Sequence, residues 1–258
     1  MLVSALTLIV AQAAAVATAP AHTAEQARLA ECLGQARTDP ATAITTANLW
    51  LIESHGPGKA LPQQCLGQAY VSVLRWDAAH DAFLAARDLT LSSDYAIRAR
   101  LGAMAGNAAL AGADLATARA DLDKAVADAA LAGDKPLAGS IAADKARALV
   151  ALGRNDEAAA TLEQARADAP QDADVWLLSA TLSRRTNDLA SAQAQIETAA
   201  GLAPTDPAVG LEAGVIAALA GNDEAARKSW DAVIGLAPDG PEAKSAKAYL
   251  AQVGGVAQ

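Results

Sequence analysis

Three Ala-Pro pairs recur at a constant interval in the C-terminal half of the chain. They are Ala169-Pro170, Ala203-Pro204 and Ala237-Pro238, and each follows the last by 34 residues. This interval is typical of arrays of helix-turn-helix units, because one such unit cannot bury its apolar face alone and must stack on its neighbours. Proline lacks the backbone N–H that a helix interior needs, so it ends each unit. The spacing therefore predicts a stack of helix pairs.

The units that end at these pairs also share small and large residues at fixed positions. When proline takes position 32 of a 34-residue frame, position 20 is always Ala and position 24 is always large. Residues four apart lie on one helical face, so each second helix presents a small residue beside a large one for close packing. These positions hold Ala158, Ala192 and Ala226, then Leu162, Ile196 and Trp230.

The same positions upstream resemble the tetratricopeptide repeat consensus. A frame that begins at Ala60 matches it at Leu66, Gly67, Tyr70, Ala79, Phe83 and Ala86. The resemblance implies an all-α fold, a right-handed α-solenoid of about six helix-turn-helix repeats with a C-terminal capping helix. The repeats would begin near Ala27, Ala60, Ala99, Gly139, Ala173 and Pro207.

Two parts of the array depart from a uniform period. The frame from Ala99 runs past its normal end to Pro136, which predicts a longer second helix or a longer following loop. The first unit is irregular, although its pentapeptide Cys32-Leu33-Gly34-Gln35-Ala36 recurs 33 residues later from Cys65. We expect the array to occupy residues 24–240, a solvent-facing cap to follow at 241–253, and residues 254–258 to fray.

The N-terminal 21 residues have the composition of an export signal. They carry no charged side chain, and an apolar run from Leu2 to Val16 precedes small residues. This pattern favours a signal peptide cleaved after Ala17, Ala19 or, as the best fit, Ala21. An uncleaved inner-membrane anchor is an alternative, because about 20 apolar residues can just span a bilayer. A second alternative is that the start of a cytoplasmic protein has been wrongly assigned. We expect a periplasmic protein, bound to the membrane only if the segment is retained.

Charge and motif content exclude several functions. The net charge of −9 argues against nucleic acid, whose binding needs a basic stripe. The three histidines, His22, His55 and His80, are scattered without metal-ligand spacing, and neither a nucleophile elbow nor a phosphate-binding glycine loop is present. We therefore predict no enzyme, no cofactor, no metal site and no small-molecule substrate.

The resemblance also suggests which residues face a partner. In tetratricopeptide repeat proteins the first helix of each unit builds a concave inner wall. Its family positions, transferred to this chain, predict a polar groove with several arginines, which hints at an acidic or carboxylate-bearing peptide. The family's carboxylate-clamp pattern is absent, because Ala103 precedes Asn107 and the next unit has Asp144. The predicted groove residues are Gln64, Gln68, Arg100, Asn107, Arg147, Thr181, Arg184 and Arg185.

These observations lead to two hypotheses about function. The first is a non-catalytic scaffold or adaptor of the bacterial cell envelope, which binds a protein or peptide segment in the groove. The alternative is a periplasmic holdase-type assembly factor, which would bind many exported chains weakly.

The two cysteines, Cys32 and Cys65, give conflicting indications. An even cysteine number in an exported protein favours a disulfide. Both residues take the same position of successive units, however, which in an ideal array places them on helices about 8–10 Å apart, while a bridge needs Cα atoms within about 7 Å. A turn of the irregular first helix would bring Cys32 toward Cys65, and oxidising compartments rarely leave two nearby thiols free, so we predict the bridge.

Overall fold

The computed structural model describes residues 23–254, which form thirteen α-helices and one short 3₁₀ helix without any strand. The predicted export signal and residues 255–258 of the predicted tail lie outside these residues. The helices are arranged in six antiparallel pairs, and a final helix follows them. In chain order they are α1 (Ala24–Thr38), α2 (Pro40–Glu53), η1 (Gly56–Lys59), α3 (Ala60–Ser72), α4 (Trp76–Leu89), α5 (Tyr95–Ala111), α6 (Leu115–Leu131), α7 (Lys135–Ala151), α8 (Asn155–Asp168), α9 (Ala173–Arg185), α10 (Leu189–Leu202), α11 (Pro207–Leu219), α12 (Asp223–Leu236) and α13 (Pro241–Gly254).

Local sequence explains where most helices begin. Asp or Asn precedes α2, α6, α7, α9, α10, α11 and α12, and its side chain accepts a hydrogen bond from a backbone N–H of the first turn. Such caps satisfy donors that have no partner within the helix. In the last three pairs, Gly153, Asn187 and Gly221 turn the chain between the two helices at positive φ.

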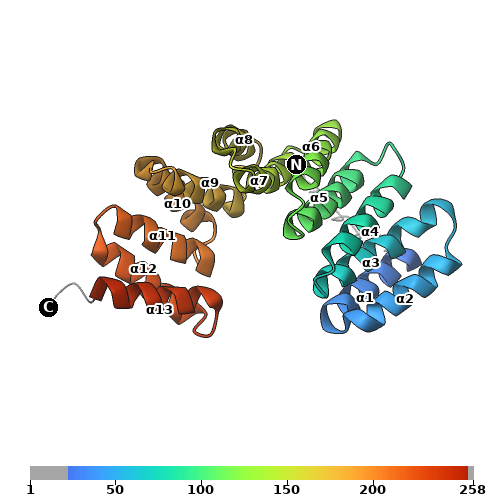
Figure 1. Cartoon of the computed structure of the whole chain (residues 1–258), viewed down its shortest axis with the longest axis horizontal. Coiled ribbons are helices and arrows are strands. Elements are labelled where there is room, and N and C mark those ends of the chain that lie inside the picture. Colours follow the sequence, from blue (N-terminus) through green and yellow to red (C-terminus); the bar gives the residue numbers. More distant parts are fainter. Residues whose placement is uncertain (1–22, 255–258) are drawn as a thin grey trace, which may run out of the picture.

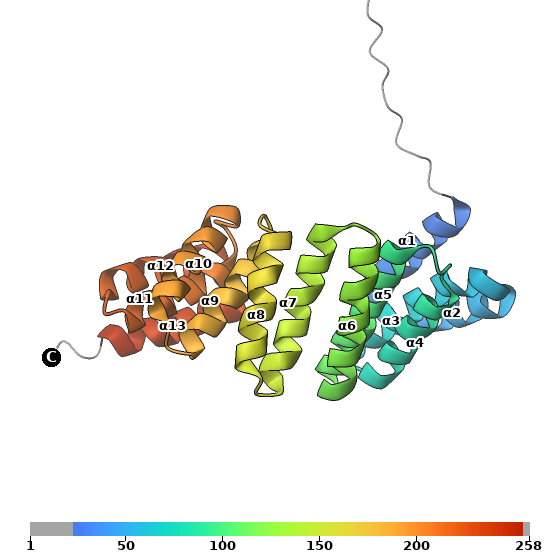
Figure 2. The same cartoon turned by 90° about the horizontal axis from the view of Figure 1, so that it is seen from above.

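The pairs are stacked into an arch, so the predicted all-α solenoid is confirmed. Figure 1 shows α7 and α8 at the top of the arch, which we call its crown, with α1 and α13 at the two ends. Around the crown α5 and α7 lie on the inner side and α6 and α8 on the outer side. Contacts join successive first helices, from α5 to α7, α9 and α11. From above, α6, α7, α8 and α9 lie side by side in chain order (Figure 2).

The three central helices are about one turn longer than the repeat frame predicts. Each of α5, α6 and α7 has 17 residues, whereas α9 and α11 have 13. The first helices start at Tyr95 and Lys135, four residues before the frame starts at Ala99 and Gly139. The start of α5, the end of α6 and the start of α7 meet at one edge of the antiparallel stack. An added turn on one helix is thus covered by its neighbours.

The core consists of thin layers of small side chains with a few large side chains between them. Phe83, Leu122 and Trp230 are at most 2% exposed, and each lies against a glycine of the preceding helix. A Cβ atom built at Gly67 would lie 2.5 Å from the Phe83 ring, and one built at Gly106 would lie 2.7 Å from Cγ of Leu122. The glycines let the two helices of a pair approach closely.

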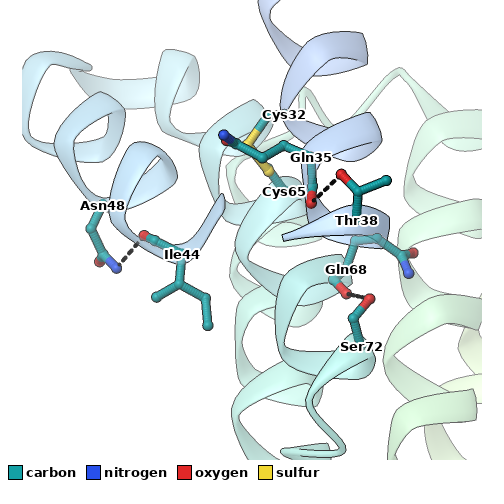
Figure 3. Close-up of a disulfide and its surroundings, with 8 residues drawn as sticks. All are labelled: Cys32, Gln35, Thr38, Ile44, Asn48, Cys65, Gln68 and Ser72. Atoms are coloured by element: carbon teal, nitrogen blue, oxygen red, sulfur yellow. Dashed lines mark hydrogen bonds between the residues drawn. A yellow bond between two sulfur atoms is a disulfide. The ribbon is translucent and has the colours of Figure 1, made fainter. Parts of the chain in front are cut away.

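The first pair is joined covalently to the second by a disulfide between Cys32 of α1 and Cys65 of α3 (Figure 3). The Cα atoms are 6.0 Å apart, and both side chains are almost completely buried. A Cβ atom built at Gly34 would meet nothing within 4 Å, so α1 does not pack closely against α2 at this glycine. The first helices α3, α5 and α11 do pack closely against their second helices at glycine. The geometric objection drawn from an ideal array therefore does not apply to this displaced helix.

The last helix covers the end of the array. Ala243 and Ala246 of α13 are completely buried, whereas Lys244 and Lys247 are exposed. The rings of Trp230 and Tyr249 pack with their centroids 5.3 Å apart. The apolar layer of the sixth pair thus ends beneath a helix with a charged outer face, as a repeat array requires.

Candidate partner-binding groove

A pocket of about 450 Å³ lies on the inner side of the arch between α7 and α9. Its walls are side chains of these two helices, and Leu162 of α8 also reaches it. Six of the lining residues are apolar, two are arginines and one is a threonine. The lining residues are Ala146, Arg147, Val150, Ala151, Leu162, Leu178, Thr181, Leu182 and Arg185.

Helical spacing explains how these residues come together. Val150 and Ala151 lie one turn after Arg147 on α7. Leu178, Thr181 and Arg185 lie one turn apart in succession on one face of α9. The contact between α7 and α9 places the two faces side by side. The predicted residues Arg147, Thr181 and Arg185 therefore share one pocket.

Arg147 is partly engaged by a neighbour on its own helix. Its guanidinium forms an ion pair with Asp144, whose Oδ2 also accepts a hydrogen bond of 2.7 Å from Nδ2 of Asn107. Burial raises the pKa of Asp144, although the hydrogen bonds from Asn107 and Arg147 oppose the rise. Asn107 belongs to α5 and Arg147 to α7, so Asp144 links two predicted groove residues on two helices of the inner wall.

Arg184 is not available to a partner, in contrast to the expectation from its repeat position. Its Nε and Nη2 donate to the two carboxylate oxygens of Glu212 on α11, at 2.6 and 3.2 Å. The two side chains are 23% and 13% exposed, respectively. The next residue differs: Arg185 is exposed, and no carboxylate within residues 23–254 forms an ion pair with it.

The other predicted residues lie nearer the N-terminus. Gln68 and Asn107 line a second hollow of about 190 Å³ between α3, α4 and α5. Arg100 is exposed and forms an ion pair with Asp134 at 3.5 Å. Gln64 is half-buried. The structure therefore groups five of the eight predicted residues into two hollows, while Gln64, Arg100 and Arg184 lie outside both.

The apolar floor of the larger pocket was missed by the sequence analysis. Leu178 and Leu182 lie at positions 6 and 10 of their repeat, which are not among the family's wall positions. Their spacing of four residues on one helix face, one turn before Arg185, is the signal that would have indicated an apolar surface beside a cation.

A second charged cluster joins the outer helices α4 and α6, away from this pocket. Nε2 of His80 lies 2.9 Å from Oδ2 of Asp121, and Nη2 of Arg87 lies 2.7 Å from Oδ2 of Asp128. Burial by itself would lower the pKa of His80, but hydrogen bonds with Asp121 and Asp81 outweigh it and raise that pKa. These pairs connect neighbouring repeats and therefore have a structural role.

The described part of the chain shows no group of His, Cys, Asp and Glu side chains placed to hold a metal ion. None of the helices in residues 23–254 combines the length and the apolarity that a membrane span requires.

Comparison with known proteins identifies the repeat. A family model described as Tetratricopeptide repeat matches residues 143–207 and 180–241. A comparison with curated protein sequences gives no match.

Solved structures have the same architecture. PilW, described as a widely conserved type IV pilus biogenesis factor, is 18% identical with a TM-score of 0.66, over 87% of this chain and 99% of that one. PilF of Pseudomonas aeruginosa is 16% identical with a TM-score of 0.64, over 87% and 97% of the two chains. A thermophilic tetratricopeptide repeat protein of Thermus thermophilus is 16% identical with a TM-score of 0.60, over 75% and 98%. At these identities the likeness concerns the fold.

Proposed function

We propose that this chain, whose residues 143–241 match the tetratricopeptide repeat family model, is a non-catalytic scaffold of the bacterial cell envelope that binds a segment of a partner protein in its concave groove. The repeat fold supports a role in protein interaction. The observation that carries the proposal is the pocket between α7 and α9, where an apolar floor and two arginines face the inside of the arch. A pocket of this kind can hold a side chain and fix its orientation.

Two features support a location outside the cytoplasm. The first 21 residues have the composition of an export signal. The disulfide between Cys32 and Cys65 suits an oxidising compartment. We propose that the mature protein begins at His22 in the periplasm. Fractionation of the native host and the intact mass of the purified protein test this. A protein that begins at Met1, or one found in the cytoplasm, would contradict it.

Capture from an envelope extract tests the function. The wild-type protein, the double variant Arg147→Ala with Arg185→Ala, and the control Arg37→Ala would each be immobilised. Arg37 is exposed near the end of α1, far from the pocket in the chain, so its variant removes a charge without altering the groove. We expect one partner in a fixed ratio with the wild type and the control, and much less with the double variant.

Other results of the capture experiment would contradict the scaffold. A broad set of exported proteins, each bound weakly, would indicate the holdase-type assembly factor instead. Equal capture by the wild type and both variants would show that the partner does not use this groove.

A further inference from the structure

We infer that the α7–α9 pocket binds one large apolar side chain of an extended partner segment, and that Arg185 binds an acidic residue next to it in that segment. This inference rests on the proposed function, because it names the chemistry that the groove selects. It also distinguishes Arg185 from the other three arginines of the predicted groove, which the sequence treats as equivalent.

The lining of the pocket indicates that the partner side chain is apolar. Its volume of about 450 Å³ falls within the range of about 300–1,000 Å³ that is usual for ligand pockets. Val150, Leu162, Leu178 and Leu182 provide its apolar lining. Burying an apolar group against this surface removes apolar area from water on both sides. A polar side chain in the same place would lose its hydrogen bonds to water.

The ion pairs of the structure indicate which arginine can bind the acidic residue of the partner segment. Arg184 already binds Glu212 through both carboxylate oxygens, and Arg147 already binds Asp144. Arg185 lines the same pocket and has no carboxylate partner within residues 23–254. A carboxylate that enters the groove can therefore pair with Arg185 without displacing another. Guanidinium groups bind carboxylates through two parallel hydrogen bonds.

The remaining charge of the protein limits how acidic the segment can be. The chain has a net charge of −9, so a run of acidic residues would be repelled elsewhere along the arch. One or two acidic residues beside the apolar anchor fit this electrostatic environment better.

A second, separate hollow among the predicted groove residues favours an internal segment over a chain terminus. The smaller hollow at Gln68 and Asn107 lies toward α3 and α5. Side chains alternate in direction along an extended segment, so an anchor that points into the α7–α9 pocket leaves its neighbours free to reach the rim.

The test uses a peptide library that does not assume the motif. A random dodecapeptide library displayed on phage would be selected against residues 22–258 with the disulfide intact. Enriched sequences would be synthesised with amidated C-termini, and their affinities would be measured by fluorescence anisotropy. We expect the enriched peptides to share a Leu, Ile, Phe or Met next to, or two residues from, an Asp or Glu.

Variants of the protein and the peptide then separate the two contacts. Arg185→Ala should weaken binding by about tenfold or more, as expected for the loss of one charge-assisted contact. Changing the acidic residue of the peptide to Asn or Gln should have a similar effect, and the two changes together should cost little more than either alone. Ala151→Phe adds an aromatic ring at an exposed residue of the pocket and should block the apolar anchor. Arg37→Ala is the control and should bind as the wild type does.

Two failures are distinguishable. Enriched peptides that lack the motif, or that bind Arg185→Ala and the wild type equally, would overturn this inference and leave the scaffold proposal standing. A selection that enriches no peptide would count against both, because an open peptide-binding groove should retain some sequences. Circular dichroism of each variant shows whether a loss of binding reflects a loss of fold.

Discussion

Trp230 of α12 packs directly onto the backbone of α11 at Gly214, so that a methyl group added to that glycine would overlap the indole ring. The indole Nε1 donates a hydrogen bond of 3.3 Å to the carbonyl oxygen of Leu211, one turn earlier on α11. This contact fixes the separation of the two helices. Gly67 with Phe83 and Gly106 with Leu122 repeat the arrangement in other pairs.

The first prediction concerns this close approach. Gly214→Ala should lower the free energy of unfolding by about 1–3 kcal/mol, because the added methyl group overpacks a site with no free volume. Urea denaturation followed by circular dichroism measures the change. Gly34→Ala is the matched control, since a Cβ atom there meets nothing within 4 Å. The control should be neutral or stabilise the protein by up to about 1 kcal/mol through helix propensity. Equal effects of the two substitutions would contradict the packing argument.

The second prediction concerns the disulfide. Replacing Cys32 and Cys65 together by Ser should destabilise the first two helix pairs by on the order of 3–4 kcal/mol in the chain-entropy model, given the 33-residue separation of the cysteines. Because each repeat contacts only its neighbours, faster hydrogen exchange should be confined mainly to α1 to α4. Exchange in α11 to α13 provides the internal reference. The uptake of two alkyl groups by the unreduced wild-type protein would show that no bridge exists.

The third prediction concerns pH. The carboxylates Asp121 and Asp81 face the His80 ring, and Lys124 also binds Asp121. Hydrogen bonds from Thr117 lower the pKa of Asp114, and the charge of His80 adds to this lowering. The pKa of His80 is raised in the folded protein. Its charge therefore adds stability that is fully present below the unfolded pKa of about 6.5 and is lost as pH rises through the higher folded value.

His80→Gln tests this pH dependence. The variant should differ most from the wild type in unfolding free energy near pH 5.5, and the difference should shrink toward roughly pH 8.5. His55→Gln, at a loop residue whose side chain makes no cap hydrogen bond, is the control for the substitution itself. A gap between His80→Gln and wild type that widens with rising pH would contradict the sign of the shift.

The fourth prediction separates two adjacent arginines. Arg184→Ala should cost about 1–3 kcal/mol of stability, because it leaves the largely buried Glu212 without its two charge-assisted hydrogen bonds. Arg185→Ala should change stability by less than about 0.5 kcal/mol, as expected for an exposed side chain. Thermal unfolding of both variants provides the comparison. If Arg184→Ala is as stable as Arg185→Ala, then the ion pair does not contribute to the α9–α11 contact.

The sequence by itself determined the helix pairs, because the signals for them are local. The Ala-Pro pairs, the Asp and Asn caps and the small residues opposite large ones all act within one repeat or between adjacent helices. Ala158 and Trp230 could thus be assigned to the packed core from the period of 34 residues, and Gly67 and Phe83 from the resemblance of their unit to the tetratricopeptide repeat consensus.

Only the tertiary structure decided which groove residues are available. Arg184 and Arg185 are neighbours in sequence, yet Arg184 meets Glu212 of the next repeat, while Arg185 points into the α7–α9 pocket. The added turns of α5, α6 and α7, and the displacement of α1 that joins Cys32 to Cys65, likewise depend on how whole helices stack. A repeat frame fixes which face of a helix a residue occupies, but the stacking of successive repeats sets the distances between charged groups, and those distances determine which arginine can bind a partner.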